Sequence, residues 1–162
     1  MKQSPFLERA QEQMKAGLIS RDGFLGKDQR NLIDILDDDD QRVKAMDLTH
    51  SAIAKRMKEF LNEASLGLGD PVEIGRNFIA CVESHRGRIP CPFVHPGIFR
   101  KTIVRGQNKK LSKEIQFTEL SIHLIGAHGF YQGRGARYRI EPEHLAAVLE
   151  IRADKEEVCP DE

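Results

Sequence analysis

The sequence predicts an α+β fold, in which N-terminal helices pack on a small antiparallel sheet of three to five strands and two short helices follow toward the C-terminus. Across residues 4–66 the apolar residues recur at the three-to-four-residue spacing of a helix. After Pro71 the period changes to two, which is typical of strands. Turn-forming residues separate the strand-like segments at short intervals, and this favours antiparallel hairpins.

Length and composition indicate one domain that spans residues 1–162. A compact chain of this length buries roughly two thirds of its unfolded surface, and 40% apolar with 31% charged residues is ordinary globular composition. Within the domain we distinguish a helical portion at residues 4–66, a sheet portion with two helices at residues 72–152 and an acidic tail at residues 153–162.

The cysteines and the hydropathy pattern predict a cytoplasmic location. Cys81, Cys91 and Cys159 are an odd number without the spacing of a disulfide framework, so we expect reduced thiols. The first residues do not form a signal peptide, and no run approaches the roughly 18 apolar residues that a bilayer crossing needs. We therefore expect a soluble protein that does not bind membranes.

Three helices are expected in the first 66 residues. Ser4 and Pro5 have the N-cap and first-turn chemistry of a helix that ends near Gly17. Asp28 is the expected cap of a second helix, and the acidic residues 37–40 are expected to form a solvated loop after it. A third helix is expected from about Asp47 or Thr49 to Ala64.

The strands are expected at residues 77–83, 98–104 and 111–117, with a turn at residues 84–87 before the chain extends again at 88–89. Cys81 is expected in the core because its strand is apolar. Thr118 then caps a short helix that ends at Gly129. A short strand at residues 138–140 and a last helix from Pro142 complete the prediction.

A metal site is the first functional hypothesis. Cys91 and His95 are four residues apart on a loop with several prolines, and a rigid loop lowers the entropic cost of gathering ligands. Glu119 and His123 are likewise at i and i+4 on the short helix. Because a hairpin brings the two ends of its strands together, we expect Cys91, His95, Glu119 and His123 to be neighbours.

The donor types indicate which ion this site prefers. A thiolate together with imidazoles favours zinc, whereas two histidines and Glu119 without Cys91 would suit iron(II). On a helical wheel, His123 and His128 are about 140° apart. The wheel therefore excludes His128 from the site while the helix is regular. Whether the site is catalytic is left open.

Three other functions remain as alternatives. Cys91 beside an imidazole is one arrangement of a thiol nucleophile. The segment 71–110 carries eight basic and two acidic residues, a net charge of +6, in a chain whose total charge is zero. Together with Arg134, Arg137 and Arg139 in the glycine-rich loop 129–139, this segment predicts an anion- or nucleic-acid-binding module. The last alternative is a protein-interaction or scaffold domain, in which the surface of helix 4–16 meets a partner or a second copy of the chain.

Overall fold

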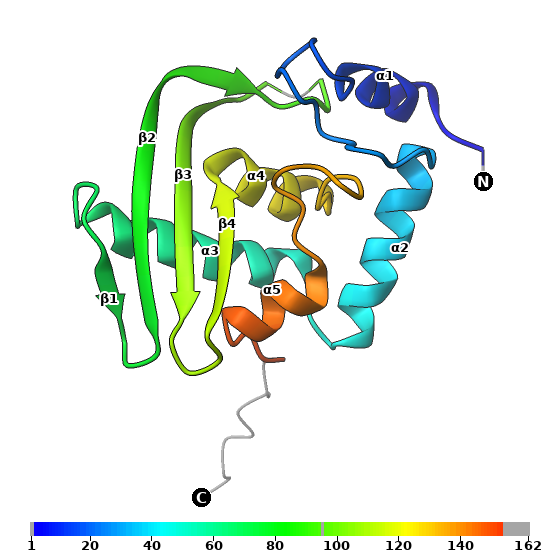
Figure 1. Cartoon of the computed structure of the whole chain (residues 1–162). Helices are drawn as coiled ribbons and strands as arrows, with labels where there is room; N and C mark the ends of the chain where they lie inside the picture. The colour runs from blue at the N-terminus through cyan, green and yellow to red at the C-terminus, as the bar shows by residue number, and fades with distance from the viewer. Residues whose placement is uncertain (1, 95, 154–162) are drawn as a thin grey trace, which may run out of the picture.

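A computed structural model describes residues 2–94 and 96–153 of the chain, and its architecture is α+β as the sequence predicts (Figure 1). The helices are α1 (Pro5–Gln13), α2 (Leu32–Ala45), α3 (His50–Ser65), α4 (Glu119–His128) and α5 (Pro142–Val148). The strands are β1 (Val72–Ile74), β2 (Phe78–Pro90), β3 (Ile98–Asn108) and β4 (Lys113–Thr118). No described helix has both the length and the apolar character that crossing a membrane requires.

The four strands form one antiparallel sheet in the order β1-β2-β3-β4. β2 and β3 pair along nearly their whole length, from Phe78 opposite Asn108 to Pro90 opposite Ile98. β4 is shorter, and its last residue Thr118 lies opposite Ile103. Residues 98–102 of β3 therefore continue past β4 and pair with β2 alone. This overhang is the two-stranded ribbon at the top of Figure 1.

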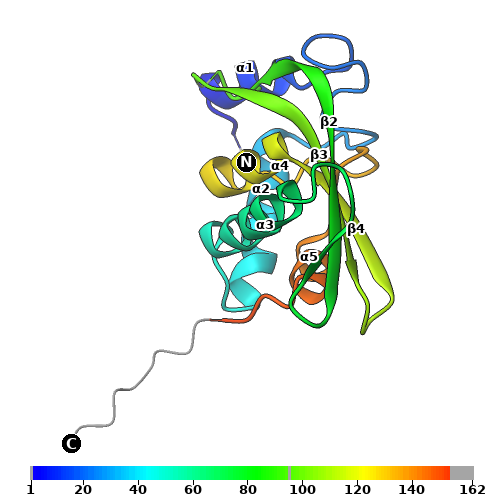
Figure 2. The same cartoon turned by 90° about the vertical axis from the view of Figure 1, so that its left-hand side faces the viewer.

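The helices cover one face of the sheet, as the turned view shows (Figure 2). The main core lies between α3, α4, α5 and this face, and it includes Phe60, Val104, Phe117 and Ile125. Inward residues alternate with outward ones along the strands. Phe78 and Ala80 therefore point into the core, whereas Cys81 lies half-buried on the outer face. The expectation of a core Cys81 is wrong because the period of two places it on the opposite side.

A second apolar cluster lies under the ribbon and joins α1, α2, α4 and the loop between β2 and β3. Its buried members are Ala10, Met14, Phe24, Leu32, Ile35, Cys91, Phe93, Leu120, Leu124 and Phe130. α4 contributes to both clusters, because its inward residues face the sheet on one side and α1 and α2 on the other. The two predicted caps of α4 are present: Thr118 forms a capping box with Ser121, and Gly129 is left-handed with φ 62°.

Three local predictions are wrong. β2 does not turn at residues 84–87; it continues through a bulge between His85 and Arg88, where Gly87 takes a φ of +97°. Asp28 does not cap α2, which begins after Asn31. The segment 138–140 is not a strand.

The acidic run 37–40 is part of α2 rather than a loop. Asp39 is fully buried there and pairs with Arg139, whose guanidinium nitrogens lie 2.8 Å from both carboxylate oxygens. A bidentate ion pair of this kind compensates the cost of burying a carboxylate. The helix therefore continues through the run, because one of its four carboxylates has a cation from a distant segment.

The glycine-rich loop is held in place by the segment that precedes α2. The backbone N–H of Gly133 donates to Phe24, and that of Lys27 donates to Arg134. A Cβ on Gly133 would lie 2.2 Å from the Leu25 carbonyl oxygen, so this close approach requires glycine. Asp28 accepts hydrogen bonds from the Arg30 side chain and from the Arg134 N–H. The two loops therefore form one structure beside the outer face of the sheet.

Candidate metal centre

Cys91 is the first residue of the loop at the tip of the β2–β3 hairpin. Its backbone N–H donates to the Gly97 carbonyl oxygen at 3.4 Å, which closes the loop across its base. The side chain is only 4% exposed and belongs to the apolar cluster under the ribbon. The loop thus presents the sulfur inward, toward α4.

His123 lies in the middle of α4 and His128 is its last residue, and both side chains are half-buried. The end of this helix is fixed by its cap, since the N–H groups of Gly129 and Phe130 donate to the Ile125 and Leu124 carbonyl oxygens. A Cβ on Gly129 would lie 2.9 Å from the His50 ring, so only glycine fits between α4 and α3 at this point. The helix end therefore has a defined position next to the hairpin loop.

The three side chains converge on one point. The sulfur of Cys91 and one ring nitrogen each of His123 and His128 all lie within 4.8 Å of one another. The Cys91 Sγ to His128 Nε2 distance is 3.5 Å. Ligand atoms around a tetrahedral zinc ion are about 3.3–3.8 Å apart, given bonds of about 2.0–2.3 Å. Small side-chain adjustments are therefore sufficient for these three atoms to share an ion.

Aromatic rings orient both imidazoles. Phe93 stacks on His128 with a centroid distance of 4.1 Å and an interplanar angle of 7°. Phe99 lies 4.4 Å from His123 at 30°. An apolar surround excludes water and strengthens interactions between a cation and its ligands. The packing thus restricts both rings to orientations that face Cys91.

The electrostatics of the site favour a cation and a protonated free thiol. Burial raises the pKa of Cys91, and a backbone hydrogen bond from Phe93 opposes this only in part. The C-terminus of α4 carries the negative end of the helix dipole beside His128. A metal ion would deprotonate the thiol on binding. Without a metal, the raised pKa disfavours the thiolate that a nucleophilic cysteine requires.

The structure places the predicted ligands as follows. Cys91 and His123 lie together, as the hairpin argument predicts. His95 lies outside the described residues. Glu119 is not part of this cluster, and it lines a cleft of about 640 Å³ with Ser84, Arg100 and Thr102. β4 ends opposite Ile103, five residues from the start of β3 at Ile98. α4 therefore starts at a distance from the hairpin loop, and Glu119 lies one helical turn farther from this loop than His123.

The exclusion of His128 is wrong. The rings of His123 and His128 are 5.2 Å apart although α4 is regular through both residues. A helical wheel gives the directions of the Cα–Cβ bonds, whereas the ends of long side chains can converge across about 140° of helix surface. The sequence signal for His128 is its position in the last turn of the helix, next to the capping glycine.

The three predicted anion-binding arginines differ in their surroundings. Arg139 is only 4% exposed and is bound to Asp39 and Glu141, so it is not available to an external anion. Arg137 is exposed and its guanidinium lies 5.2 Å from the Tyr138 ring. Arg134 is exposed on the glycine-rich loop.

The remaining polar clusters have structural explanations. His50 bridges Asp40 and the buried Tyr131 hydroxyl, at 3.0 Å on each side, and so connects α2, α3 and the glycine-rich loop.

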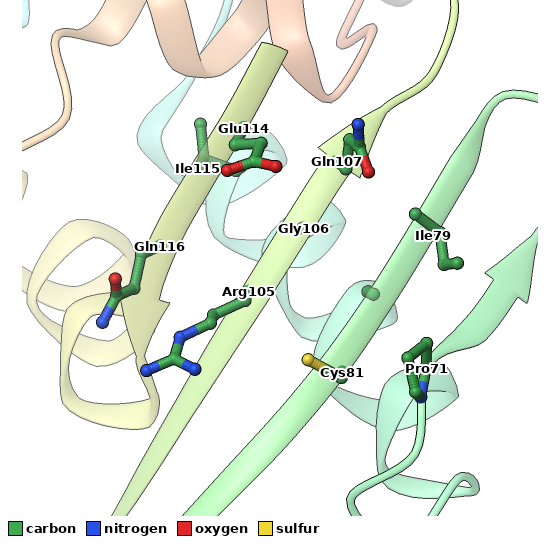
Figure 3. Close-up of a pocket in the computed structure, with 10 residues that line it drawn as sticks. Pro71, Ile79, Cys81, Arg105, Gly106, Gln107, Glu114, Ile115 and Gln116 are labelled. Carbon is green, nitrogen blue, oxygen red and sulfur yellow. The ribbon is translucent and has the colours of Figure 1, made fainter. Parts of the chain in front are cut away.

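On the outer face of the sheet, a cavity of about 450 Å³ lies beside Cys81 and Arg105 (Figure 3). Figure 3 shows that its side chains come from all three long strands, with both charges and amides present, and Arg105 is already paired with Glu83 at 2.8 Å.

No protein-family model, curated protein or solved structure matches the chain. The support for a candidate centre at Cys91, His123 and His128 is therefore the distance between their ligand atoms.

Proposed function

We propose that this protein binds one zinc ion through Cys91, His123 and His128. The observation that supports the proposal is the approach of the three ligand atoms to within 4.8 Å of one another. One sulfur and two imidazole nitrogens form a donor set that zinc accepts in both structural and catalytic sites. Iron(II) is less suitable, since Glu119, the carboxylate that it would need, lies on another cleft.

The position of the ligands favours a structural role. Cys91 comes from the hairpin loop and the two histidines come from α4, so a shared ion would cross-link the ribbon to the helix beneath it. Structural zinc sites have four protein ligands, whereas catalytic ones leave one position for water. The Cys-x3-His spacing predicts His95 as the fourth ligand, and this part of the proposal comes from the sequence alone.

Elemental analysis tests the proposal on the full chain purified without a histidine tag. We expect about one zinc per chain, and Cys91→Ser and His128→Ala should each remove most of it, because the loss of one protein ligand weakens zinc binding. Cys81→Ser and His85→Ala are matched controls, since both residues lie on strand β2 away from the site. Unchanged zinc content in Cys91→Ser and His128→Ala would contradict the proposal.

Cobalt substitution tests the ligand set directly. The cobalt(II) protein should show a thiolate charge-transfer band and the visible spectrum of a tetrahedral site, and Cys91→Ser should lose the band. His95→Ala should weaken zinc binding if His95 is the fourth ligand. Unchanged affinity in His95→Ala would instead indicate a site with three protein ligands and water.

A further inference from the structure

A cleft of about 610 Å³ lies between the outer face of the sheet and the two joined loops. β2, β3 and the end of β4 form one wall, residues 19–24 form the second, and residues 132, 137 and 138 form the third. Ile103 and Phe24 are buried at its base, and Tyr138 is half-buried at its side. A volume of this size is in the range of pockets for small organic ligands.

The charged residues that line the cleft are almost all positive. Five permanent cations contribute to its walls, namely Arg21, Arg86, Arg100, Lys101 and Arg137, against one carboxylate, Asp22. None of these five cations forms an ion pair with a described carboxylate. In a chain of zero net charge, this concentration creates a local positive potential.

The strands β2 and β3 contain an electrostatically unfavourable pair next to the cleft. Arg88 lies directly opposite Arg100 in the β2–β3 register. Like charges in directly opposed positions destabilise a sheet. The bulge between His85 and Arg88 also allows two consecutive side chains, His85 and Arg86, to line the same cleft. The concentration of positive charge therefore lowers the stability of the ribbon.

The walls of the cleft are held in place before any ligand arrives. Gly133 donates to Phe24, and Gly23 approaches so closely that a Cβ there would lie 2.6 Å from the Met14 carbonyl oxygen. Arg21 and Arg137 are thus carried by loops that are fixed to each other and to α1. Fixed positions reduce the entropy that binding must remove.

From these contacts we propose that the cleft binds phosphate groups of an anionic ligand. Guanidinium groups and an ammonium group from three walls can donate hydrogen bonds to phosphate oxygens, and guanidinium does so in a bidentate manner. A nucleoside triphosphate and a single-stranded nucleic acid present the same chemistry. The inference does not rest on zinc binding, because none of the cleft residues belongs to the metal cluster.

Fluorescence anisotropy with a labelled short oligouridylate, and competition by ATP, test the proposal at about 50 mM salt, where phosphate contacts are strongest. Lys101→Gln combined with Arg137→Gln neutralises one exposed charge on each of two walls. We expect this double variant to weaken binding by about tenfold or more and, for the oligouridylate, to reduce the salt slope by about 1.4. An unchanged circular dichroism spectrum and an unchanged melting temperature would show that it is folded.

Lys55→Gln combined with Lys58→Gln is the matched control, since it removes the same charge from the exposed side of α3. It should change affinity by less than about twofold. Binding of ATP that depends on Lys101 and Arg137 would identify a nucleotide site, and binding of the oligouridylate alone would identify a nucleic-acid strand. The proposal is overturned if neither probe binds, or if both double variants weaken binding equally.

Discussion

Cys91 is a buried thiol whose proton competes with a metal ion for the sulfur. Burial raises its pKa above the ordinary value of 9.0, so the thiol is protonated near neutral pH. The sequence indicated that Cys91 and His123 meet, because a hairpin loop and the segment after its second strand are neighbours. It did not indicate His128, whose contribution depends on the reach of a side chain and on its stacking with Phe93.

Zinc affinity should therefore fall steeply with acidification. Between about pH 8 and about pH 7, displacement of one thiol proton should lower affinity about tenfold per pH unit. Competition against a chromophoric chelator measures this profile. Cys91→His should flatten its upper part, and an unchanged slope in that variant would mean that the thiol is not a ligand.

At the scale of elements, the sequence predicts local signals well and long-range partners poorly. The Ser4 cap of α1 and the Thr118 and Gly129 caps of α4 are confirmed, because each depends on a few neighbouring residues. The acidic run 37–40 is helical rather than a loop, and the cation that stabilises Asp39 lies 100 positions away in the sequence. Asp28 does not cap a helix and instead binds Arg30 and the glycine-rich loop.

The hydrogen bond from Arg30 lowers the pKa of Asp28 from 3.8 to about 2. A depressed pKa contributes stability above the unfolded value that is lost as the pH falls from about 4 to about 2. The shift corresponds to about 2 kcal/mol, and the side chain is only 2% exposed. Asp28→Asn should lower the free energy of unfolding at neutral pH and reduce its loss in acid.

Urea unfolding at several pH values measures this effect. Asp70→Asn is the control, because Asp70 is exposed in the turn between α3 and β1 and the variant makes the same change of charge. The acid sensitivity of Asp70→Asn should match that of the unmodified protein. If Asp28→Asn also keeps the full sensitivity, the Asp28–Arg30 contact does not contribute to it.

At the scale of the whole molecule, the candidate centre joins parts that the sheet alone leaves loosely connected. Cys91 belongs to the ribbon tip and the two histidines belong to α4, whose other residues pack in both apolar clusters. The overall α+β architecture was predictable, because periodicity and turn residues determine it. The register of β4 against β3 was not, and it places the start of α4 opposite Ile103, where Glu119 lines a cleft with Thr102.

Zinc should therefore stabilise the complete fold. At a free zinc concentration about 100 times the dissociation constant, binding adds about 2.7 kcal/mol. In a domain of this size that corresponds to a rise in melting temperature of roughly 5–10 °C. Differential scanning fluorimetry with and without a chelator measures it. Cys81→Ser should keep the full rise and Cys91→Ser should lose it; a rise retained in Cys91→Ser would place the stabilising ion elsewhere.

The overhang of β3 has a consequence for how copies of this protein meet. Residues 98–102 pair with β2 alone, so one side of this segment presents backbone donors and acceptors to which a strand from another molecule could add. Arg100 and Lys101 lie on this segment, and the same cations on a second copy would repel it. The charges that we assign to phosphate recognition thereby also protect the open edge against aggregation.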